Sequence, residues 1–250
     1  MLKLKNIVKT FYKGSPDEKI IFKDFNLEVK KGEFVTIIGG NGAGKSTLMN
    51  MISGTIFPEC GKVFIDENDV TSLPEFKRAK FIGRVFQDPL KGSAPNLTIE
   101  ENLSLAFLRG QRRGFKFGVS KANTEFFKEK LSELNLGLED RLTTKMGLLS
   151  GGQRQAVTLL MAVLSRPKIL LLDEHTAALD PKSSAKILDL TEKITQDSEI
   201  TTLMITHNMQ NALNFGSRLL MLNQGKIEMD LNGDERKNLK FCQLQEKFNF

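Results

Sequence analysis

Cysteine, long apolar runs and low-complexity segments are scarce or missing in this sequence. The two cysteines, Cys60 and Cys242, are too few for a disulfide framework and lack the spacing of metal ligands. No apolar run approaches the ~20 residues that a membrane-spanning helix needs. The opening residues 1–5 lack the apolar stretch of a signal peptide. These absences argue against a disulfide-stabilised secreted domain and an integral membrane protein, and we expect a protein kept in the cytosol.

The remaining composition is that of a globular protein. The 250 residues are 40% hydrophobic and 26% charged, which predicts one large domain or two small ones with an ordinary core. The net charge is +6 and the isoelectric point is about 9.2. Nucleic acid, anionic lipid or a nucleotide could each account for such a charge.

The positive charge is concentrated in one stretch without an acidic residue. Its basic residues are Arg109, Arg112, Arg113, Lys116 and Lys121. A solvated loop is the simplest interpretation, and contact with lipid headgroups or a membrane partner is the second. RNA binding is a weaker third, because only Phe115 and Phe117 offer stacking there.

Hydrophobic patterning predicts a mixed α/β core. Strands are predicted where apolar and charged residues alternate and where short apolar runs occur. They cover residues 2–11, 20–29, 34–38, 169–172 and 203–206. An amphipathic helix is predicted over 183–194.

The segment from about 89 to 164 has a helical character instead. Thr98 is predicted to cap a helix whose first turn holds Glu100 and Glu101. A second helical pattern covers 126–134. We expect this segment to be a helical subdomain inserted into the α/β core.

A phosphate-loop motif occupies residues 39–46, which read Gly-Gly-Asn-Gly-Ala-Gly-Lys-Ser between a predicted strand and a predicted helix over 48–52. Glycines leave backbone N–H groups free to close around phosphates, and the helix turns its positive end toward the same anion. Lys45 would reach the β- and γ-phosphates, and the Ser46 hydroxyl is a magnesium ligand in such loops. The motif predicts a nucleotide site.

Two carboxylates, Asp173 and Glu174, follow the apolar run over 169–172. In phosphate-loop NTPases the first acid at the end of such a strand helps to hold magnesium. The sequence therefore predicts Asp173 as a magnesium ligand.

A second motif lies far downstream, where residues 149–155 read Leu-Ser-Gly-Gly-Gln-Arg-Gln. Gly151 and Gly152 allow close backbone approach, Ser150 adds a hydroxyl, and a helix over 153–164 would present its N-terminus to an anion. With both motifs present, the chain resembles the ATPase subunit of an ABC (ATP-binding cassette) transporter. The resemblance covers nearly the whole chain, and five motifs occur in the family's order.

The resemblance implies an α/β fold, namely the P-loop NTPase ABC ATPase core. Such a core has a mixed sheet with an N-terminal antiparallel β portion and an inserted α-helical subdomain. The chain would be a single ABC ATPase domain over 1–250. Its core would cover about 1–88 and 165–250, and its helical subdomain about 89–164.

The resemblance also implies catalytic roles. Glu174 would polarise the attacking water, a contribution of ~10²- to 10⁴-fold in rate. His207, after Thr206, would contact the γ-phosphate as the switch histidine. Gln87 would be a neutral oxygen ligand for magnesium, sense the γ-phosphate and relay its presence to the helical subdomain. The implied catalytic set is Glu174, His207, Lys45 and Gln87, and the magnesium set is Ser46, Gln87 and Asp173.

Further ATP contacts follow from the same resemblance. Asp180 matches the D-loop, which crosses the dimer interface, and an aromatic ring after the first strand would stack on adenine. Phe11 aligns best with that ring and Tyr12 is the alternative, although either could be ordinary core. The implied ATP-binding residues are Phe11, Gly39, Asn41, Gly42, Ala43, Gly44, Lys45, Ser46, Thr47, Gln87, Ser150, Gly151, Gly152, Gln153 and Asp180.

The implied function is ATP hydrolysis in a homodimer, with ATP and Mg²⁺ as cofactors. Two ATP molecules would lie between the phosphate loop of one copy and the family's signature motif, residues 149–155, of the other. The dimer would drive a membrane permease through the surface beside Gln87, as a peripheral subunit on the cytoplasmic face, without binding nucleic acid. Import is favoured because no transmembrane segment is fused, and an extracytoplasmic substrate-binding protein is expected in the same system. The alternative is a soluble ABC ATPase of iron–sulfur cluster assembly, although its signature usually has Glu where Gln153 stands.

One position departs from the family's pattern. Transporter ATPases usually have Pro after the catalytic Glu, whereas this chain has His175. This leaves the local backbone geometry open, and His175 is either a tolerated surface substitution or a catalytic residue. Together with the runs 86–89 and 93–98, it resembles a bacterial subgroup linked to the uptake of amino acids, including tryptophan-type substrates.

Overall fold

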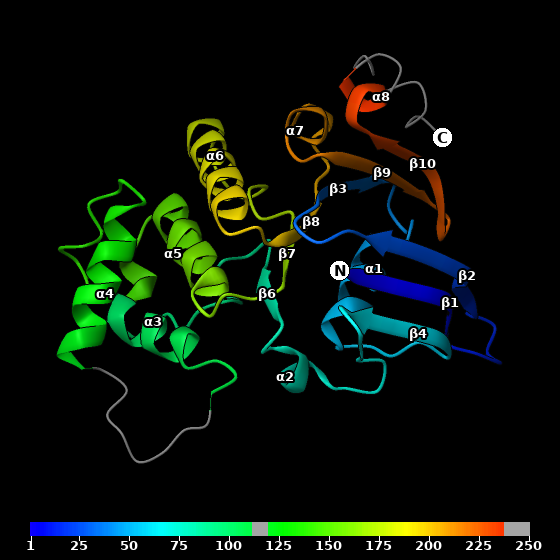
Figure 1. The fold of residues 1–250 in the computed structure, drawn as a ribbon, viewed down its shortest axis with the longest axis horizontal. Helices are drawn as coiled ribbons and strands as arrows, with labels where there is room; N and C mark the ends of the chain where they lie inside the picture. The colour runs from blue at the N-terminus through cyan, green and yellow to red at the C-terminus, as the bar shows by residue number, and fades with distance from the viewer. Residues whose placement is uncertain (112–119, 238–250) are drawn as a thin grey trace.

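A computed structural model describes residues 1–111 and 120–237, and it shows two β-sheets beside a group of helices (Figure 1). The strands are β1 (Leu2–Phe11), β2 (Lys19–Val29), β3 (Phe34–Gly39), β4 (Cys60–Ile65), β5 (Asn68–Asp69), β6 (Ile82–Val85), β7 (Ile169–Asp173), β8 (Thr201–Ile205), β9 (Arg218–Asn223) and β10 (Lys226–Asn232). The helices are α1 (Lys45–Ser53), α2 (Glu75–Arg78), α3 (Ile99–Phe107), α4 (Lys121–Ser132), α5 (Gly151–Val163), α6 (Pro181–Asp197), α7 (Met209–Asn214) and α8 (Gly233–Lys237), with a 3₁₀ turn at Met146–Leu148.

The first sheet is antiparallel, with its strands in the order β2-β1-β4-β5. β1 pairs with β2 from Leu2 opposite Val29 to Phe11 opposite Lys19. Leu2 and Leu4 are buried, as the alternating pattern predicts for one face of a strand. This sheet corresponds to the predicted N-terminal antiparallel portion.

The second sheet has six strands in the order β10-β9-β3-β8-β7-β6. The strands from β9 to β6 run parallel, and β10 returns antiparallel to β9. Every residue of β3 and β8 is buried, as expected for central strands that are covered on both faces. β3 ends at Gly39 and β7 at Asp173, so the phosphate loop and the two acids leave the same edge of the sheet.

The helices α3, α4 and α5 share a hydrophobic cluster of their own, to which α6 contributes Ile187. α3 begins as predicted, because the Thr98 hydroxyl accepts from the Glu101 N–H at 3.2 Å and the Glu101 carboxylate accepts from the Thr98 N–H at 2.7 Å. In Figure 1 these three helices lie to the left of β6 and β7, and the antiparallel sheet lies to the right. The subdomain boundaries near residues 89 and 164 stay a prediction.

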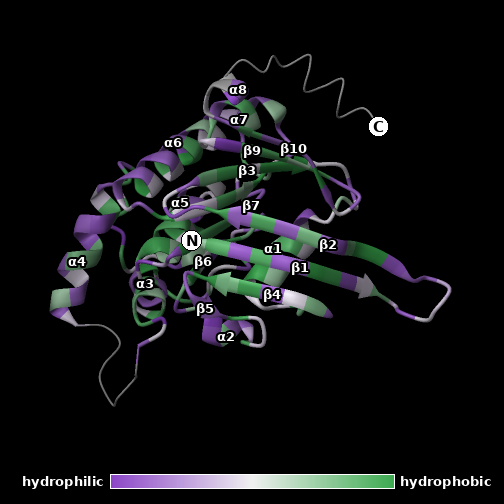
Figure 2. Ribbon diagram, turned by 45° about the vertical axis from the view of Figure 1, so that its right-hand side comes forward, coloured by the Kyte–Doolittle hydropathy of each residue, from purple (hydrophilic) through white to green (hydrophobic). Residues whose placement is uncertain are grey.

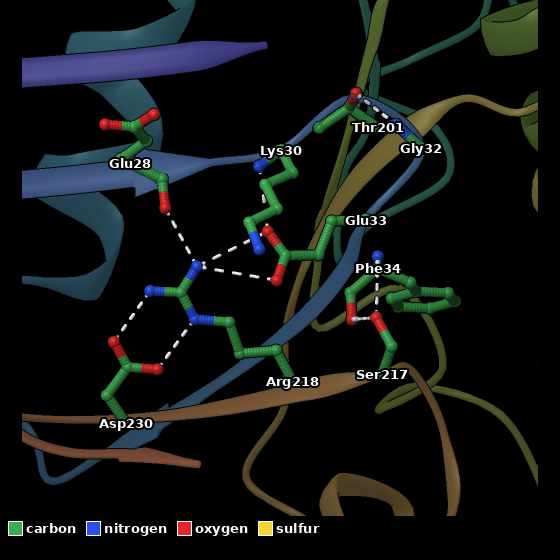
Figure 3. A network of polar contacts seen from close by, with 9 residues as sticks. All are labelled: Glu28, Lys30, Gly32, Glu33, Phe34, Thr201, Ser217, Arg218 and Asp230. Carbon is green, nitrogen blue, oxygen red and sulfur yellow. Dashed lines mark hydrogen bonds and ion pairs between the residues drawn. The ribbon is translucent and has the colours of Figure 1, made fainter. Parts of the chain in front are cut away.

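The guanidinium of Arg218, at the start of β9, joins the two sheets (Figure 3). It donates to both carboxylate oxygens of Asp230 on β10 at 2.6 Å and to the carbonyl oxygen of Glu28 on β2 at 2.8 Å. Glu33, just before β3, accepts at 3.3 Å. These acceptors, Asp230 above all, raise the pKa of Arg218. One side chain thereby connects residues 28–33 with residues 218–230, two parts of the chain that are far apart in sequence.

The distribution of apolar residues over the strands and helices agrees with a folded core. Figure 2 shows β3 as an almost continuously apolar strand and α4 and α6 as helices of mixed character. Within 1–111 and 120–237, no helix combines the length and the apolarity that crossing a bilayer demands. Cys60 is an exposed free cysteine, and Cys242 lies outside the described residues.

Candidate functional site

The phosphate loop connects β3 to α1, as predicted, and close contacts require its glycines. A Cβ on Gly39 would lie 2.3 Å from the Leu222 carbonyl oxygen. Gly44 caps α1 with a φ of 104°, and a Cβ there would lie 3.1 Å from the Phe22 ring. Only glycine adopts that backbone without strain. The loop is therefore shaped so that its N–H groups can bind an anion at a helix N-terminus.

Lys45, the first residue of α1, is only 7% exposed. Its Nζ donates to the carbonyl oxygens of Gly39 at 2.6 Å and Gly40 at 3.0 Å. Burial lowers the pKa of Lys45, while the nearby carboxylates of Glu174 and Asp173 act in the opposite direction. The lysine and both acids thus share one electrostatic environment, which suits a residue that binds phosphate oxygens.

A cavity of about 460 Å³ lies against the phosphate loop, and we call it the loop cavity. Its lining residues are Phe11, Tyr12, Lys19, Ile21, 41–47, Glu174 and His207. Glu174 Oε1 lies 2.6 Å from His207 Nε2. Glu174 also has a φ of 48°, a left-handed conformation that costs a non-glycine residue about 1–2 kcal/mol. Strain of this kind is concentrated at functional sites.

Gln87 and Asp173 line a second cavity, of about 590 Å³. We call it the Q-loop cavity, after the segment 85–89 around Gln87, which resembles the Q-loop of the family. Asp173 Oδ2 lies 3.4 Å from Nη2 of Arg84. The third predicted magnesium ligand, Ser46, lines the loop cavity instead. The structure therefore places the three predicted ligands along two cavities, one lined by Asp173 and the other by its neighbour Glu174.

The chemistry of these three residues suits magnesium. Ser46, Gln87 and Asp173 supply a hydroxyl, an amide and a carboxylate oxygen, and Mg²⁺ prefers oxygen ligands. Mg²⁺ also keeps several waters and binds substrate phosphates, so a few protein ligands suffice. Across 1–111 and 120–237, no group of three or more His, Cys, Asp or Glu residues forms a dedicated metal site. The residues present fit a metal that binds together with a nucleotide.

His175 is not at the surface, so its interpretation as a tolerated surface substitution is wrong. Its side chain is 2% exposed, and Nε2 lies 3.2 Å from the Thr191 hydroxyl on α6. Burial lowers the pKa of His175 to about 4, so the ring is neutral at neutral pH. His175 also does not line the loop cavity, although Glu174 beside it does. Its side chain points into the core beneath α6 rather than toward a nucleotide.

The signature residues 150–153 lie at the N-terminus of α5. The Ser150 hydroxyl accepts from the Gln153 N–H and the Gln153 side chain accepts from the Ser150 N–H, each at 3.3 Å. Ser150 and Gly151 are exposed. A Cβ on Gly152 would lie 3.1 Å from Ser183 on α6, which explains the close helix packing. None of the four residues lines the loop cavity, so one copy of the chain does not bring the two motifs together.

Three further predicted ATP contacts lie at the ends of secondary-structure elements. Asp180 caps α6 by accepting from the Ser183 N–H at 3.0 Å, and the Ser183 hydrogen bonds lower its pKa. Phe11 ends β1, is half-buried and has the Lys9 ammonium 5.2 Å from its ring centroid. Tyr12 is 73% exposed. Both aromatic residues line the loop cavity, so both remain candidates for stacking on adenine.

Sequence reasoning missed two basic residues of the site. Lys19, at the start of β2, lines the loop cavity, with its Nζ 3.5 Å from where a Cβ of Gly42 would lie. Arg84 contacts Asp173 and also donates to the Asn50 side chain at 2.9 Å. Neither belongs to a motif. A lone arginine within the otherwise apolar β6 was the one available signal.

The basic stretch is described only at its two ends. Arg109 is partly buried, and Lys121 is exposed at the start of α4. Arg112, Arg113 and Lys116 lie outside the described residues, as do Phe115 and Phe117. Contact of this stretch with lipid or a membrane partner therefore stays a prediction.

Residues 22–177, which include the phosphate loop, both acids and the signature, match the family described as ABC transporter. The chain belongs to the ABC transporter family. This ABC transporter subunit binds ATP and is an ATPase, as the sequence predicts.

Individual ABC proteins match the chain over most of its length. A tyrosine transport ATP-binding protein of Clostridioides difficile (strain R20291) is 44% identical over 100% of this chain and 99% of that protein. An uncharacterized ABC transporter ATP-binding protein of Methanocaldococcus jannaschii is 38% identical over 92% of this chain and 96% of that protein.

Solved ABC cassettes have the same fold. The post-hydrolysis dimer of the cassette MJ0796 with ADP and Pi has a TM-score of 0.79 and 34% identity, over 93% of this chain and 98% of that chain. The ADP conformation of the cassette MJ1267 has a TM-score of 0.81 and 28% identity, over 99% of this chain and 96% of that chain. These similarities confirm the predicted fold class.

Proposed function

We propose that this ABC transporter ATPase works as a homodimer that couples ATP hydrolysis to the uptake of an amino acid, of the tyrosine or tryptophan type, by a separate membrane permease. The observation that carries the chemistry is the loop cavity, where Lys45, Glu174 and His207 meet. The 44% identical tyrosine transport protein supports the cargo class. A spermidine/putrescine import ATP-binding protein of Fusobacterium nucleatum, 34% identical over 89% of this chain and 54% of that protein, supports import.

In this proposal the N–H groups of the phosphate loop and the Lys45 ammonium hold the phosphates. Glu174 accepts a proton from the attacking water, and His207 orients the Glu174 carboxylate through their 2.6 Å contact while it also reaches the γ-phosphate. Mg²⁺, held by Ser46, Gln87 and Asp173, would neutralise charge on the phosphates. The chain's own residues thus position the nucleotide and remove the proton.

The homodimer follows from the separation of the two motifs. The exposed Ser150 and Gly151, at the positive end of α5, do not line the loop cavity of their own copy. In a dimer they would face the γ-phosphate held by the other copy, with Asp180 at the interface. The dimeric form of the related cassette MJ0796 supports this arrangement.

The permease would dock beside the Q-loop cavity, and the subunit would therefore sit on the cytoplasmic face of the membrane. Pro89 lines this cavity, and Leu90 beside it is 41% exposed. These apolar side chains at the rim would pack against a short cytoplasmic helix of the permease. An extracytoplasmic substrate-binding protein would deliver the cargo to the permease.

Uptake by reconstituted vesicles tests the cargo. With the permease, the substrate-binding protein and this chain present, labelled tyrosine or tryptophan should accumulate only when ATP and Mg²⁺ are supplied. Accumulation of a polyamine instead would contradict the amino-acid proposal. Copurification with soluble iron–sulfur assembly proteins, without any permease, would favour the alternative, to which the relatives named for transport give no support.

Leu97→Glu is expected to uncouple ATP hydrolysis from transport, because it places a charge on the proposed docking surface over residues 87–97. Leu97 is half-buried, and its backbone N–H and C=O are bonded to Ala94 and Met146, so the loop should keep its shape. ATPase activity of the isolated subunit should change less than about twofold, because Leu97 lines neither the loop cavity nor the Q-loop cavity. Transport by the reconstituted complex should be lost.

Ile20→Glu is the matched control for Leu97→Glu, because Ile20 is a 56% exposed apolar residue on β2. It should leave transport unchanged. Crosslinking from single cysteines placed over 87–97, in a chain whose Cys60 and Cys242 are replaced by Ser, should capture the permease. Capture of RNA, or of no membrane protein, would contradict the docking proposal.

Phe11→Ala is expected to weaken ATP binding, because stacking on a base is worth about 1–3 kcal/mol, or roughly 5- to 150-fold in affinity. Tyr12→Ala should change it much less, since Tyr12 lies past the end of β1 and is largely exposed. Titration with a fluorescent ATP analogue measures both. A larger loss in Tyr12→Ala would assign the stacking role to Tyr12 instead.

A further inference from the structure

A buried hydrogen bond connects the catalytic turn to α6. The turn runs from Glu174 to Asp180, between the end of β7 and the cap of α6. His175 Nε2 lies 3.2 Å from the hydroxyl of Thr191, in the middle of α6. Both side chains are almost fully buried, at 2% and 1% exposure. The contact is therefore shielded from water and from any nucleotide.

The direction of this hydrogen bond follows from the bonds of Thr191. Its hydroxyl donates to the carbonyl oxygen of Ile187, one turn earlier, at 2.7 Å. A hydroxyl has one proton to donate, so it accepts from His175. The imidazole thus carries its proton on Nε2. Loss of the Thr191 oxygen would leave a buried N–H without an acceptor, which is a costly state.

The backbone conformation of Glu174 depends on the contacts that hold this residue and its neighbours in place. Its N–H donates to the Ile205 carbonyl oxygen at 3.1 Å, and its carbonyl oxygen accepts from the Ala177 N–H at 2.9 Å. Its φ of 48° is unfavourable for a side-chain-bearing residue. Such a conformation persists only when the surroundings fix it. The buried ring of the next residue, His175, supplies an anchor on the α6 side.

The same helix touches the signature. Ser183, in the first turn of α6, lies 3.1 Å from where a Cβ of Gly152 would be. Leu179, just before α6, lies 3.3 Å from where a Cβ of Gly151 would be. α6 is therefore in contact with the signature at its start and with His175 near its middle. α6 thus connects the signature with His175, the residue next to Glu174.

We propose that His175 is a positioning residue that, through its hydrogen bond to Thr191 on α6, holds Glu174 in its left-handed conformation with the carboxylate beside His207. The inference rests on the proposed role of Glu174 as the base. It assigns a function to the position where the ABC pattern usually has Pro. His175 touches neither water nor phosphate in this scheme and acts only through Glu174.

Thr191→Val and Thr191→Ser test the hydrogen bond in the full-length chain. Val keeps the branched shape but removes the acceptor, whereas Ser keeps the hydroxyl. Thr191→Val should lower kcat about tenfold, a fraction of the ~10²- to 10⁴-fold that a positioned base supplies, with the affinity for ATP within about twofold of the parent. Thr191→Ser should keep most of the kcat of the parent. Thermal unfolding and a fluorescent ATP analogue report stability and affinity separately.

Thr195→Val is the matched control, because Thr195 is also buried on α6 and donates to a carbonyl one turn back, that of Glu192, but does not contact His175. It should leave kcat unchanged. If Thr191→Val destabilises the protein, the double variant His175→Phe/Thr191→Val provides a second test. It removes both polar partners and should therefore be more stable than Thr191→Val alone, while its kcat stays low.

Three results would overturn the inference. They are equal kcat values for the Val and Ser variants of Thr191, a loss in Thr195→Val that matches the loss in Thr191→Val, and a fall in ATP affinity that accounts for the whole effect. The proposed function is tested apart from these, by Glu174→Gln. If that variant loses turnover while Thr191→Val keeps it, the role of Glu174 stands and only the positioning role of His175 fails.

Discussion

Glu174→Gln is expected to keep ATP binding, to lower turnover by about 10²- to 10⁴-fold and to trap an ATP-bound dimer. The amide has the shape of the carboxylate and can still form a hydrogen bond with His207, so the side chain at position 174 should stay beside His207, as in the 2.6 Å contact. It cannot accept a proton from water, because a neutral amide is a very weak base. The substitution does not alter the hydrogen bonds of Lys45 or the phosphate loop, so the nucleotide should still bind.

The measurements are steady-state phosphate release and size-exclusion chromatography with ATP and Mg²⁺. The variant should elute as a dimer with ATP and as a smaller species without it. Glu199→Gln is the matched control, because Glu199 is likewise a glutamate at positive φ, 49°, but is exposed and does not line the loop cavity. Near-normal hydrolysis by Glu174→Gln would remove Glu174 from the proposed mechanism.

Ser150→Arg is expected to spare ATP binding and to abolish hydrolysis. Ser150 is exposed at the cap of α5 and does not line the cavity of its own copy, so a nucleotide should bind there as before. In the proposed dimer, however, the arginine would occupy the space that the other copy's γ-phosphate needs. Loss of the cap costs about 1 kcal/mol, which the fold should survive.

Mixing two inactive variants tests whether the signature acts on the other copy. In a heterodimer of Ser150→Arg with Lys45→Ala, one composite site carries both changes and the other carries neither. Activity should therefore return to the mixture if a single site can turn over. Ser120→Arg, which alters the corresponding cap of α4, should remain active alone. Failure of Ser150→Arg to bind ATP by itself would contradict a role in the other copy's site.

The parts of the fold that were predictable from the sequence are those with short-range patterns. The predicted strand over 2–11 matches β1 in both bounds, and Thr98 caps α3 with Glu101 as its partner. In each case the signal is contained in a few consecutive residues, through alternation of side chains or a local hydrogen bond. The phosphate loop was equally readable, because its glycines and Lys45 are adjacent.

The parts that were not predictable depend on contacts between distant segments. The Arg218 network joins residues separated by as many as 190 positions, and nothing near Arg218 in sequence indicates Glu28 as a partner. The hydrogen-bond partner of His175 is Thr191, 16 residues away on α6. The separation of Gln87 from Ser46 into two cavities is a property of the folded surface. The assigned roles of the site residues still await the variants described above.

The position of β3 in the middle of its sheet has a consequence for the folding of the protein during its synthesis on the ribosome. β3 ends at Gly39, but both strands that flank it, β8 and β9, begin only at Thr201 and Arg218. At about 5–20 residues per second, the nascent chain carries this apolar strand with both edges open for on the order of ten seconds or more. Non-local pairing of this kind is intrinsically slow. Prompt shielding of residues 34–39 by a chaperone should therefore set the yield of active ATPase as much as the stability of the finished fold does.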